Sequence, residues 1–460
     1  MSRRLKRRKI TAFEPEYFYV DATLGSDANR GKTASDAWQT IAKVNAYTFD
    51  AGDYILFKRG ETWAGTALTP PQDNLSFGAY GAGAKPIIDG NDAVNCVNAN
   101  GRSNLVFKDL DLTQGVDAGF NFITCSYISV IDCDAHDAGN DCLLFITGCH
   151  HCTVRGGDFY VAYERVGGVI STGIEIADDC HDIEVYGATC RNNIGTLGVG
   201  MSIHSHALTA IPYNITIDNC TFHTNTTNGI QVLEQNNAAD ADRNIVIKNC
   251  TTHTNTHDGI RIYKSGGATT YPIGVDFYGN YSHSNTRYAF WLEGDTLLVR
   301  NNRLRGRGYI NASVGTNFWN NTMYLEVGGG LYPLYIQGAR TAGIDVKNNI
   351  TDATLAGGMM IGVDAAVVGA IDIDYNLYFL EAENVNATRW HWQGVAKNWA
   401  NWLLDSAQDA NSPAADQDPL FVNPGTDFTL QALSPAIDAG VDVGLPYLGT
   451  APDCGYAERE

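Results

Sequence analysis

Hydrophobic and polar residues alternate in short stretches that recur along the chain at a fixed spacing. The clearest copies are two 30-residue segments that begin at Asn214 and Asn244 and align without gaps. Each holds an alternating apolar stretch, a turn rich in Asn and Gly, and a second alternating stretch, GIQVL or GIRIY. Alternation with a period of two predicts β-strands, whereas helical repeats would place apolar residues three and four positions apart. Self-similarity at a period of about 20 to 50 residues predicts a solenoid.

Weaker copies of the repeat extend in both directions, from NLVFKDLDL at Asn104 to GAIDIDYNLY at Gly369. Strands this short cannot bury a face alone, so about ten coils have to stack on one another. The sequence therefore predicts an all-β chain folded as a single-stranded right-handed parallel β-helix. We divide it into a basic flexible arm (1–16), an N-terminal cap with the first coils (17–100), the β-helix (101–379) and a C-terminal capping segment (380–460).

Stacked coils should align like residues in ladders one rung apart. Two ladders share one turn of the repeat: asparagines at Asn219, Asn249, Asn301, Asn320 and Asn348, and beside them Cys133, Ala188, Cys220 and Cys250. Each of these three cysteines begins a Cys-x-x-His spacing, which resembles a zinc-ligand pattern. A set that repeats with the fold period is expected of stacking, so we interpret it as a core thiol column beside an imidazole column.

Short caps are predicted at both ends of the solenoid. Ser35 is the expected N-cap of an amphipathic helix, AWQTIAKV, that shields the first rung from pairing with another chain. A second helix is expected around Val395 to Leu404, ahead of the closing segment.

Composition and charge narrow the possible partners. The formal net charge of −20 argues against nucleic acid, whose binding depends on Lys and Arg. The basic start, MSRRLKRRKI, is expected to be a solvated tail. We expect no membrane partner, because no apolar run reaches the roughly 18 residues of a membrane span. The 11 cysteines, an odd number, argue against a disulfide framework.

The start of the chain also bears on localisation. No apolar core of a signal peptide follows the basic stretch, so we expect no signal peptide. The protein would then act extracellularly if another route releases it, for example a phage particle or lysis of the host. Otherwise we expect it to be cytoplasmic.

The repeat and its caps resemble the pectate-lyase-like right-handed β-helix superfamily, in particular bacterial and phage proteins built from parallel β-helix repeats. The resemblance covers nearly the whole chain, including the opening YFYVDATLGSDANRG and the closing DPLFVNPGTDF. It implies the fold and a substrate that lies in a groove along one exposed sheet. It does not imply one reaction, because this architecture carries lyases, hydrolases, epimerases, phage tailspikes and adhesins.

The second strand of each coil is the predicted groove, since it precedes the longest and most variable loops. Aligning these strands on their first Gly or Ala turns alternate residues outward. The first outward column is Glu175, Ser202, Gln231, Arg261 and Trp291, the second is His204, Leu233, Tyr263 and Glu293, and the following turn holds Asp178, Ser205, Glu234 and Lys264. Later coils, such as YPLYIQG and GGMMIGV, are expected to offer mainly Gly, Ala and apolar residues there.

Two reactions fit these residue types, and we slightly favour a polysaccharide lyase acting on a long acidic polymer. Its β-elimination needs a cation against the sugar carboxylate, a base and an acid. Arg261 is the candidate cation, and Lys264, Tyr263 or His204 could move protons. A glycoside hydrolase would use two carboxylates from Glu175, Asp178, Glu234 and Glu293. A non-catalytic binder or tailspike-like adhesin would use the same groove.

The candidate residues follow from these columns. The catalytic set is Arg261, Tyr263, Lys264, His204, Glu175 and Glu234, and the substrate-binding set is Trp291, Gln231, Glu293 and Asp258. Polar residues on strand exteriors also have a purely structural interpretation, in which charged pairs such as Glu234 with Lys264 stabilise the stack.

No cofactor follows firmly from the sequence, and calcium is the one candidate. Asp178 and Asp179, with Asp137 and Asp141, offer the oxygen ligands that calcium prefers, although Asp is also an ordinary residue of tight turns. The expected partner is a polysaccharide, and the chain is a monomer or a side-by-side trimer.

Overall fold

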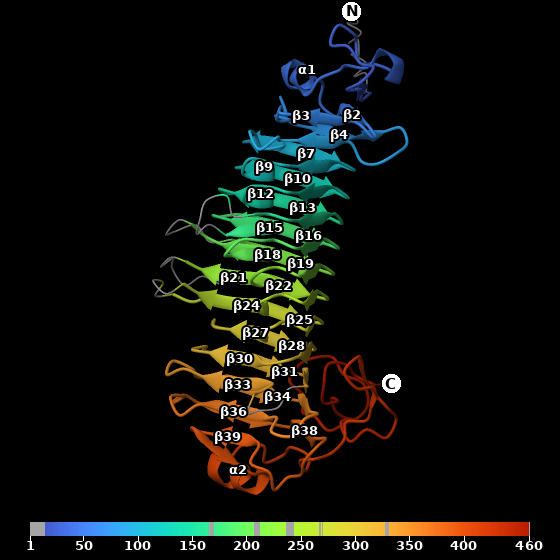
Figure 1. Cartoon of the computed structure of the whole chain (residues 1–460). Coiled ribbons are helices and arrows are strands. Elements are labelled where there is room, and N and C mark those ends of the chain that lie inside the picture. The colour runs from blue at the N-terminus through green and yellow to red at the C-terminus, as the bar shows by residue number, and fades with distance from the viewer. Residues whose placement is uncertain are drawn as a thin grey trace, which may run out of the picture.

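The chain winds into a parallel β-solenoid in which successive coils add strands to three sheets (Figure 1). This computed structural model describes residues 14–163, 165, 170–206, 212–235, 243–265, 268, 270–326 and 331–459. Almost all strand pairs are parallel and join strands three positions apart in sequence order. The predicted parallel β-helix is therefore confirmed, while the basic start of the chain (1–13) lies outside the described residues.

The first sheet holds fourteen strands. They are β1 (Tyr17–Val20), β2 (Tyr54–Lys58), β4 (Leu75–Tyr80), β7 (Ser103–Lys108), β10 (Ser126–Ile131), β13 (His150–Arg155), β16 (His181–Tyr186), β19 (Tyr213–Asp218), β22 (Ile245–Lys248), β25 (Val275–Tyr278), β28 (Leu298–Arg300), β31 (Asn317–Trp319), β34 (Ile344–Lys347) and β37 (Ile371–Asp374).

The second sheet holds thirteen short strands. They are β3 (Thr62–Ala64), β5 (Ile87–Asp89), β8 (Asp111–Thr113), β11 (Asp134–His136), β14 (Asp158–Tyr160), β17 (Thr189–Arg191), β20 (Thr221–His223), β23 (Thr251–His253), β26 (Tyr281–His283), β29 (Arg303–Arg305), β32 (Thr322–Leu325), β35 (Ile350–Ala353) and β38 (Leu377–Leu380).

The third sheet, called the groove sheet below, also holds thirteen strands. They are β6 (Val97–Asn100), β9 (Ala118–Ile123), β12 (Asp141–Ile146), β15 (Ser171–Ala177), β18 (Gly198–His204), β21 (Ile230–Glu234), β24 (Asp258–Lys264), β27 (Tyr288–Leu292), β30 (Gly308–Asn311), β33 (Leu334–Gln337), β36 (Ile361–Val363), β39 (Trp390–Trp392) and β40 (Val395–Lys397), the last antiparallel to β39.

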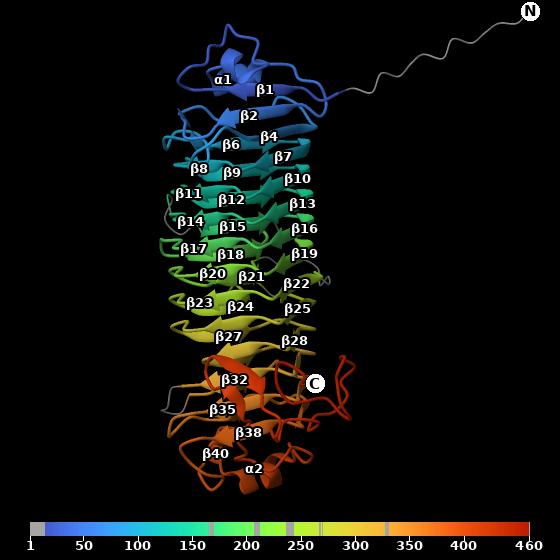
Figure 2. The ribbon, with the colours of Figure 1, turned by 90° about the vertical axis from the view of Figure 1, so that its right-hand side faces the viewer.

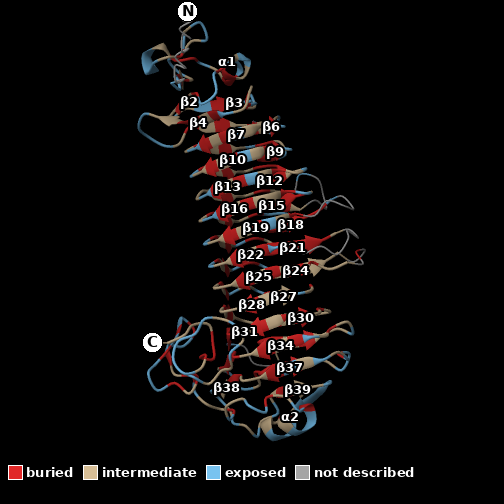
Figure 3. Cartoon of the chain, turned by 180° about the vertical axis from the view of Figure 1, so that it is seen from behind, coloured by how far each residue is buried: buried red, intermediate tan, exposed pale blue. Residues whose placement is uncertain are grey.

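Apolar side chains at alternate positions of each strand form one continuous core along the solenoid (Figure 3). Ile230 lies opposite Ile260 on the next rung, and Ile260 lies opposite Phe290, as the strand alignment predicted. All three side chains are fully buried. Because no single coil encloses a core, each rung depends on the rungs above and below it for burial.

Asparagine supports the turns in two neighbouring positions. The predicted ladder from Asn219 to Asn348 has left-handed backbone, with φ of 55° and 58° at these two residues. The continuous amide ladder lies one residue later, where the column that contains Cys220 and Cys250 continues as asparagine. In it each amide nitrogen donates to the amide oxygen of the next coil, through Asn280, Asn302, Asn321, Asn349 and Asn376.

Removing one amide from this ladder should destabilise the solenoid. Asn321 accepts from Asn302 and donates to Asn349 and to the carbonyl oxygen of Val299, all out of contact with water. We expect Asn321→Ala to lower the free energy of unfolding by about 1–3 kcal/mol, because buried polar groups lose their partners. Urea unfolding followed by circular dichroism measures it. Asn317→Ala, at a partly exposed position of the same coil, is the control, and equal stability of the two variants would contradict the ladder's role.

The cysteine and the histidine of each Cys-x-x-His pattern lie on opposite sides of the solenoid wall, the cysteine in the core and the histidine on the outer face. Cys220 and Cys250 are buried, as are all the other cysteines, and the structure has no disulfide in its described part. His223, His253 and His283 stack on the outer face of the second sheet, with ring centroids 4.7 and 5.1 Å apart. The thiol column and the imidazole column are therefore separate, as the repeat predicted.

The N-terminal cap is present, but its helix begins later than predicted. Helix α1 spans Ile41–Ala46, and its N-cap is Thr40, whose side chain accepts a hydrogen bond from the Lys43 amide. The prediction of Ser35 as N-cap was wrong, since Ser35 lies in a short 3-10 helix (Ala34–Asp36). The chain is extended between the two because Trp38 pairs with Val20 and buries its ring against Phe18 over the open end of the first coil.

The C-terminal segment caps the other end and then folds back. Helix α2 spans Trp399–Ser406, so it begins later than the predicted Val395, which lies in β40. After α2 the chain returns along the side of the solenoid (Figures 1 and 2). It forms the hairpin β41 (Phe421–Asn423) and β42 (Asp427–Leu430) and packs Cys454 in a second apolar cluster. Of the helices in the described residues, none has the length and apolar character needed to span a membrane.

Candidate functional site

The outward columns predicted for the groove sheet are present in register. Glu175 lies opposite Ser202, Ser202 opposite Gln231, Gln231 opposite Arg261, and Arg261 opposite Trp291. Beyond Trp291 the same column continues through Tyr309 and Tyr335 before it reaches Gly362, so the later coils carry more aromatic residues than the prediction stressed. Tyr309 stacks on Trp291 with 5.3 Å between the ring centroids, so the aromatic surface that begins at Trp291 extends over at least one further coil.

Much of this outer face is recessed. Every residue of β15, β18 and β21 is buried, including the outward ones, whereas outward residues of the first-sheet strand β13 are partly or fully exposed. Two pockets open here and share Ile170 and Gln235 in their walls. We call them the arginine pocket, of about 330 Å³, with Gln231, His257, Arg261, Tyr263 and Arg287, and the carboxyl pocket, of about 400 Å³, with Asp117, Asp141, Glu175, His204 and His206.

The arginine pocket has a locally positive field in a strongly acidic protein. The Arg261 guanidinium lies 4.1 Å from the centre of the Tyr263 ring, and its buried Nε has no hydrogen-bond partner among the described residues. The nearest carboxylate is Asp258, with Oδ2 3.7 Å from that Nε. Burial raises the pKa of Asp258 to about 6, although Arg261, Arg287 and Arg307 oppose the shift. The charges of three arginines thus act on one buried carboxyl group, and two of these arginines, Arg261 and Arg287, line the pocket.

Two groups of this pocket have protonation states suited to proton transfer. Burial raises the pKa of Tyr263 despite the opposing charge of Arg261, so the phenol stays protonated at neutral pH. Its hydroxyl donates to Gln231 Oε1 at 3.2 Å. Burial, together with Arg287 and Arg261, lowers the pKa of His257, so this imidazole is neutral. The pocket therefore offers cations, an acid and a base.

The carboxyl pocket brings together two buried carboxyl groups and two imidazoles. Burial raises the pKa values of Asp141 and Glu175. The charge of Asp141 raises the pKa of Glu175 further, whereas hydrogen bonds with Thr172 and Glu175 oppose the rise in the pKa of Asp141. Thr172 donates to Asp141 Oδ1 at 2.6 Å. Burial lowers the pKa of His204 to about 3, so its ring is neutral. Its Nε2 lies 3.1 Å from Nε2 of His206.

Several predicted site residues lie outside these two clusters. Glu234 is buried in an ion pair with Arg243, which closes the ends of the loop between them. Lys264 donates to the carbonyl oxygen of Ala268 at 2.7 Å. Glu293 is half-buried, and burial raises its pKa. The structure thus does not bring the candidate carboxylates Glu175, Glu234 and Glu293 together in one cluster.

The predicted calcium ligands lie in turns. Asp178 and Asp179 have φ of 50° and 57°, the left-handed backbone common at such turns. Asp178 accepts hydrogen bonds from the backbone and ring of His206, whereas the neighbouring Asp179 is exposed. Asp137 instead bonds to His136. The four carboxylates are therefore spread over several partners, and calcium stays a prediction.

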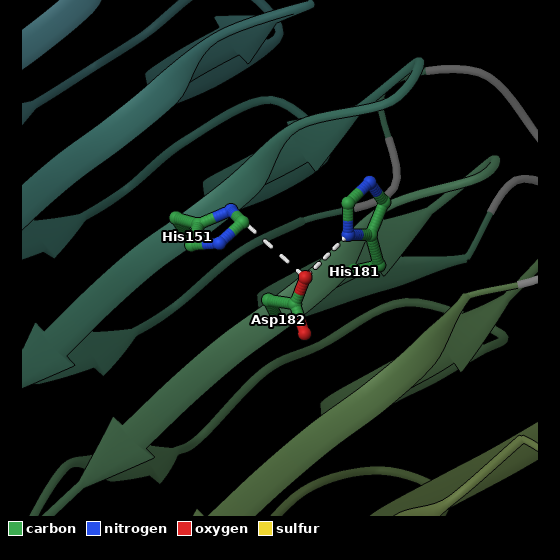
Figure 4. A group of neighbouring side chains, drawn as sticks. All are labelled: His151, His181 and Asp182. Atoms are coloured by element: carbon green, nitrogen blue, oxygen red, sulfur yellow. Dashed lines mark hydrogen bonds and ion pairs between the residues drawn. The ribbon is translucent and has the colours of Figure 1, made fainter.

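Two groups of side chains in the described part of the chain are close enough to hold a metal ion. The first, His151, His181 and Asp182, lies on the first sheet and is partly exposed (Figure 4). In it Asp182 accepts from His181 Nδ1 at 2.7 Å, and His151 Nδ1 lies 3.9 Å away. The second, in the carboxyl pocket, is Glu175, His204 and His206.

Sequence reasoning missed three residues of the two pockets, Arg287, His257 and His206, and considered a fourth, Asp141, only as a calcium ligand. Arg287 and His257 lie in turns before their strands, so the alignment of strand interiors passed over them. Asp141 lies at the first position of β12, opposite Thr172 rather than Glu175. His206 had a usable signal, because it follows His204 by two residues and so belongs to the same outward series.

Comparison with known proteins agrees with this architecture. Residues 87–304 match the family model described as right handed beta helix region, and no curated protein matches the sequence. The tailspike protein of E. coli bacteriophage HK620, solved with a pentasaccharide, is similar with a TM-score of 0.50 and 12% identity, over 75% of this chain and 66% of the tailspike. Pectate lyase Pel9A gives 0.46 and 18% over 98% of both chains. A lacto-N-biosidase from Eubacterium ramulus gives 0.41 and 14% over 82% of this chain and 67% of the enzyme.

The match to the family model covers a little under half of the chain, and the observed parallel solenoid agrees with the β-helix fold that the resemblance in sequence implied. At these identities the likeness defines the fold and leaves the reaction to be argued from the site.

Proposed function

We propose that the protein is a carbohydrate-active enzyme that binds a long acidic polysaccharide along the groove sheet and cleaves it by β-elimination. The observation that carries the proposal is the arginine pocket, which Arg261 and Arg287 line, with Asp258 as the carboxylate within 4 Å of Arg261 among the described residues. A net positive recess in a chain of formal charge −20 favours an anionic ligand at this position. The phage tailspike of similar fold was solved with a pentasaccharide, so such a fold can hold an oligosaccharide.

The pocket supplies each group that elimination requires. The guanidinium of Arg261 pairs with the uronate carboxylate and stabilises the negative charge that develops beside it. Neutral His257 removes the proton from the adjacent carbon, the electrons of that C–H bond form a C=C bond, and the C–O bond to the leaving sugar breaks. The Tyr263 hydroxyl gives its proton to the leaving oxygen. Trp291 and Tyr309 extend the groove as an aromatic surface for neighbouring sugar rings.

Hydrolysis is the second candidate, because the carboxyl pocket holds Asp141 and Glu175. Glycosidases separate their two carboxyl groups by about 5–5.5 Å or 6.5–9.5 Å, so that a sugar or a water fits between them. Asp141 and Glu175 are close enough to share a hydrogen bond. Glu234 is neutralised by Arg243. This arrangement supports hydrolysis less well than the arginine pocket supports elimination.

Incubation with acidic and neutral polysaccharides tests the proposal. We expect new ultraviolet absorbance from unsaturated chain ends with an acidic polymer, and no cleavage of the same polymer after chemical reduction of its carboxyl groups. New reducing ends without that absorbance would indicate hydrolysis and overturn the elimination. Binding without any cleavage would indicate a non-catalytic adhesin.

A further inference from the structure

The imidazoles of His204 and His206 face each other across the floor of the carboxyl pocket. The two Nε2 atoms are 3.1 Å apart, and each lies 3.8 Å from Oε1 of Glu175. His204 and Glu175 are at least nine-tenths buried, whereas His206 is half-exposed at the pocket mouth. Three ligand atoms of the kinds that bind transition metals therefore converge on one point that remains reachable from solvent.

The opposite nitrogen of each ring is already engaged. His206 Nδ1 lies 3.2 Å from Asp178 Oδ2, and His204 Nδ1 lies 2.9 Å from Ser202 Oγ. Ser202 also accepts from Gln231, which a hydroxyl allows because its oxygen has two lone pairs. With both Nδ1 atoms donating, both Nε2 lone pairs point at each other and at Glu175. Metal-binding histidines are oriented by hydrogen bonds of this kind on the other ring nitrogen.

The spacing agrees with one shared ion. Two nitrogens at about 2.0–2.1 Å from a tetrahedral zinc ion lie about 3.3 Å apart. The observed separation of the Nε2 atoms is 3.1 Å. Without an ion or a proton between them, three electron-rich atoms would be held together in a buried site, which is costly.

We propose that Glu175, His204 and His206 bind one divalent transition-metal ion of the zinc class. Two imidazoles and one carboxylate leave a fourth position open, as in catalytic rather than structural zinc sites. The pocket that holds these three ligands is also lined by Asp117, Asn140 and Asp141. The ligand set differs from the all-oxygen set that calcium prefers, and it gives Asp178 the role of orienting His206. The proposal does not depend on the elimination reaction.

The surface group of His151, His181 and Asp182 is the weaker candidate. Asp182 accepts a hydrogen bond from His181 Nδ1 at 2.7 Å, so that nitrogen is already engaged with the carboxylate and is not available to an ion. His151 Nδ1 also lies 2.8 Å from Nδ1 of His150, which satisfies it without a metal. The group therefore serves as a control.

Zinc titration of the chelator-treated full-length chain, with a chromophoric chelator as competitor, tests the proposal. We expect the wild type to bind one zinc ion per chain. His206→Ala removes a ligand and should lower the zinc affinity at least ~100-fold, a larger effect than the loss of a residue that only orients a ligand. Asp178→Asn should lower it by about 10–100-fold through loss of the orienting carboxylate. Asp179→Asn, an exposed neighbour with the same backbone conformation, and His181→Ala should bind zinc as the wild type does.

Circular dichroism and melting temperature of the variants separate misfolding from loss of the site, and His206, at the pocket mouth, is the safest ligand to replace. Absence of stoichiometric zinc in the wild type would overturn the proposal in favour of a shared proton. So would unchanged affinity in folded His206→Ala, or loss of zinc on Asp179→Asn. Zinc binding that persists while no polysaccharide is cleaved would count against the proposed function alone.

Discussion

Replacing Arg261 by alanine is expected to lower turnover of an acidic polysaccharide by at least ~100-fold, the usual cost of removing one positioned charge stabiliser. Arg261 is the only arginine of the pocket that stacks on Tyr263 in the described structure, and its Nε is buried without a hydrogen bond. A uronate carboxylate would supply the missing acceptor. Initial rates with a soluble polymer, measured by the absorbance of unsaturated ends, give the effect.

Two further variants sharpen this expectation. Arg261→Lys keeps the charge but loses the planar group that stacks on Tyr263, so we expect partial activity. Arg155→Ala is the matched control, because Arg155 lies on the first sheet in an exposed pair with Glu184, 2.8 Å away. If Arg261→Ala degraded the polymer at the wild-type rate with an unchanged melting curve, the site would have to lie elsewhere on the solenoid.

Much of the groove could be predicted from the sequence because a β-helix repeats its backbone. Alternation with a period of two fixes which residues turn outward, and the constant rung fixes which residues become neighbours. The neighbours of Arg261, namely Gln231 and Trp291, were therefore correct. The same logic gave the column of asparagines that includes Asn249, and the structure shows a left-handed backbone there, which a short amide side chain tolerates.

Only part of the carboxyl pocket could be predicted in this way, because Glu175 and His204 lie inside strands and follow the period, whereas Asp141 and His206 lie at or beyond strand ends. Asp141 is the first residue of β12 and lies opposite Thr172, two positions before Leu143, which lies opposite Ile174. His206 follows the end of β18. The ion pair of Glu234 with Arg243 joins two residues nine positions apart, the first at the end of β21 and the second just before β22. Strand alternation predicts contacts only between residues inside strands, so it does not predict contacts between side chains that lie beyond the strand ends.

The ion pair of Glu234 with Arg243 leads to the second large effect. Both side chains are buried, with exposed fractions of 2% and 1%. Burial lowers the pKa of Arg243, and the charge of Glu234 opposes that shift. The pair therefore exchanges hydration for mutual attraction, and replacing either side chain removes that attraction while the other charge stays buried.

Arg243→Met is expected to lower the free energy of unfolding by about 3–5 kcal/mol, the usual cost of breaking a buried ion pair from one side. Arg243 also holds the rungs together through its backbone, since its carbonyl accepts from Asn214 and its amide donates to Ile273. A side-chain replacement keeps both bonds, so the loss reports on the charge pair. Urea unfolding followed by circular dichroism and by tryptophan fluorescence measures it.

The double variant Glu234→Gln/Arg243→Met decides whether the buried charge of Glu234 is the cause. It removes the buried carboxylate as well, so it should regain a large part of the stability that Arg243→Met alone loses. Arg155→Met, which breaks the exposed pair with Glu184, should cost no more than about 1 kcal/mol. Additive losses in the double variant would mean that packing around the Arg243 stem, rather than the charge of Glu234, accounts for the stability of this part of the groove wall.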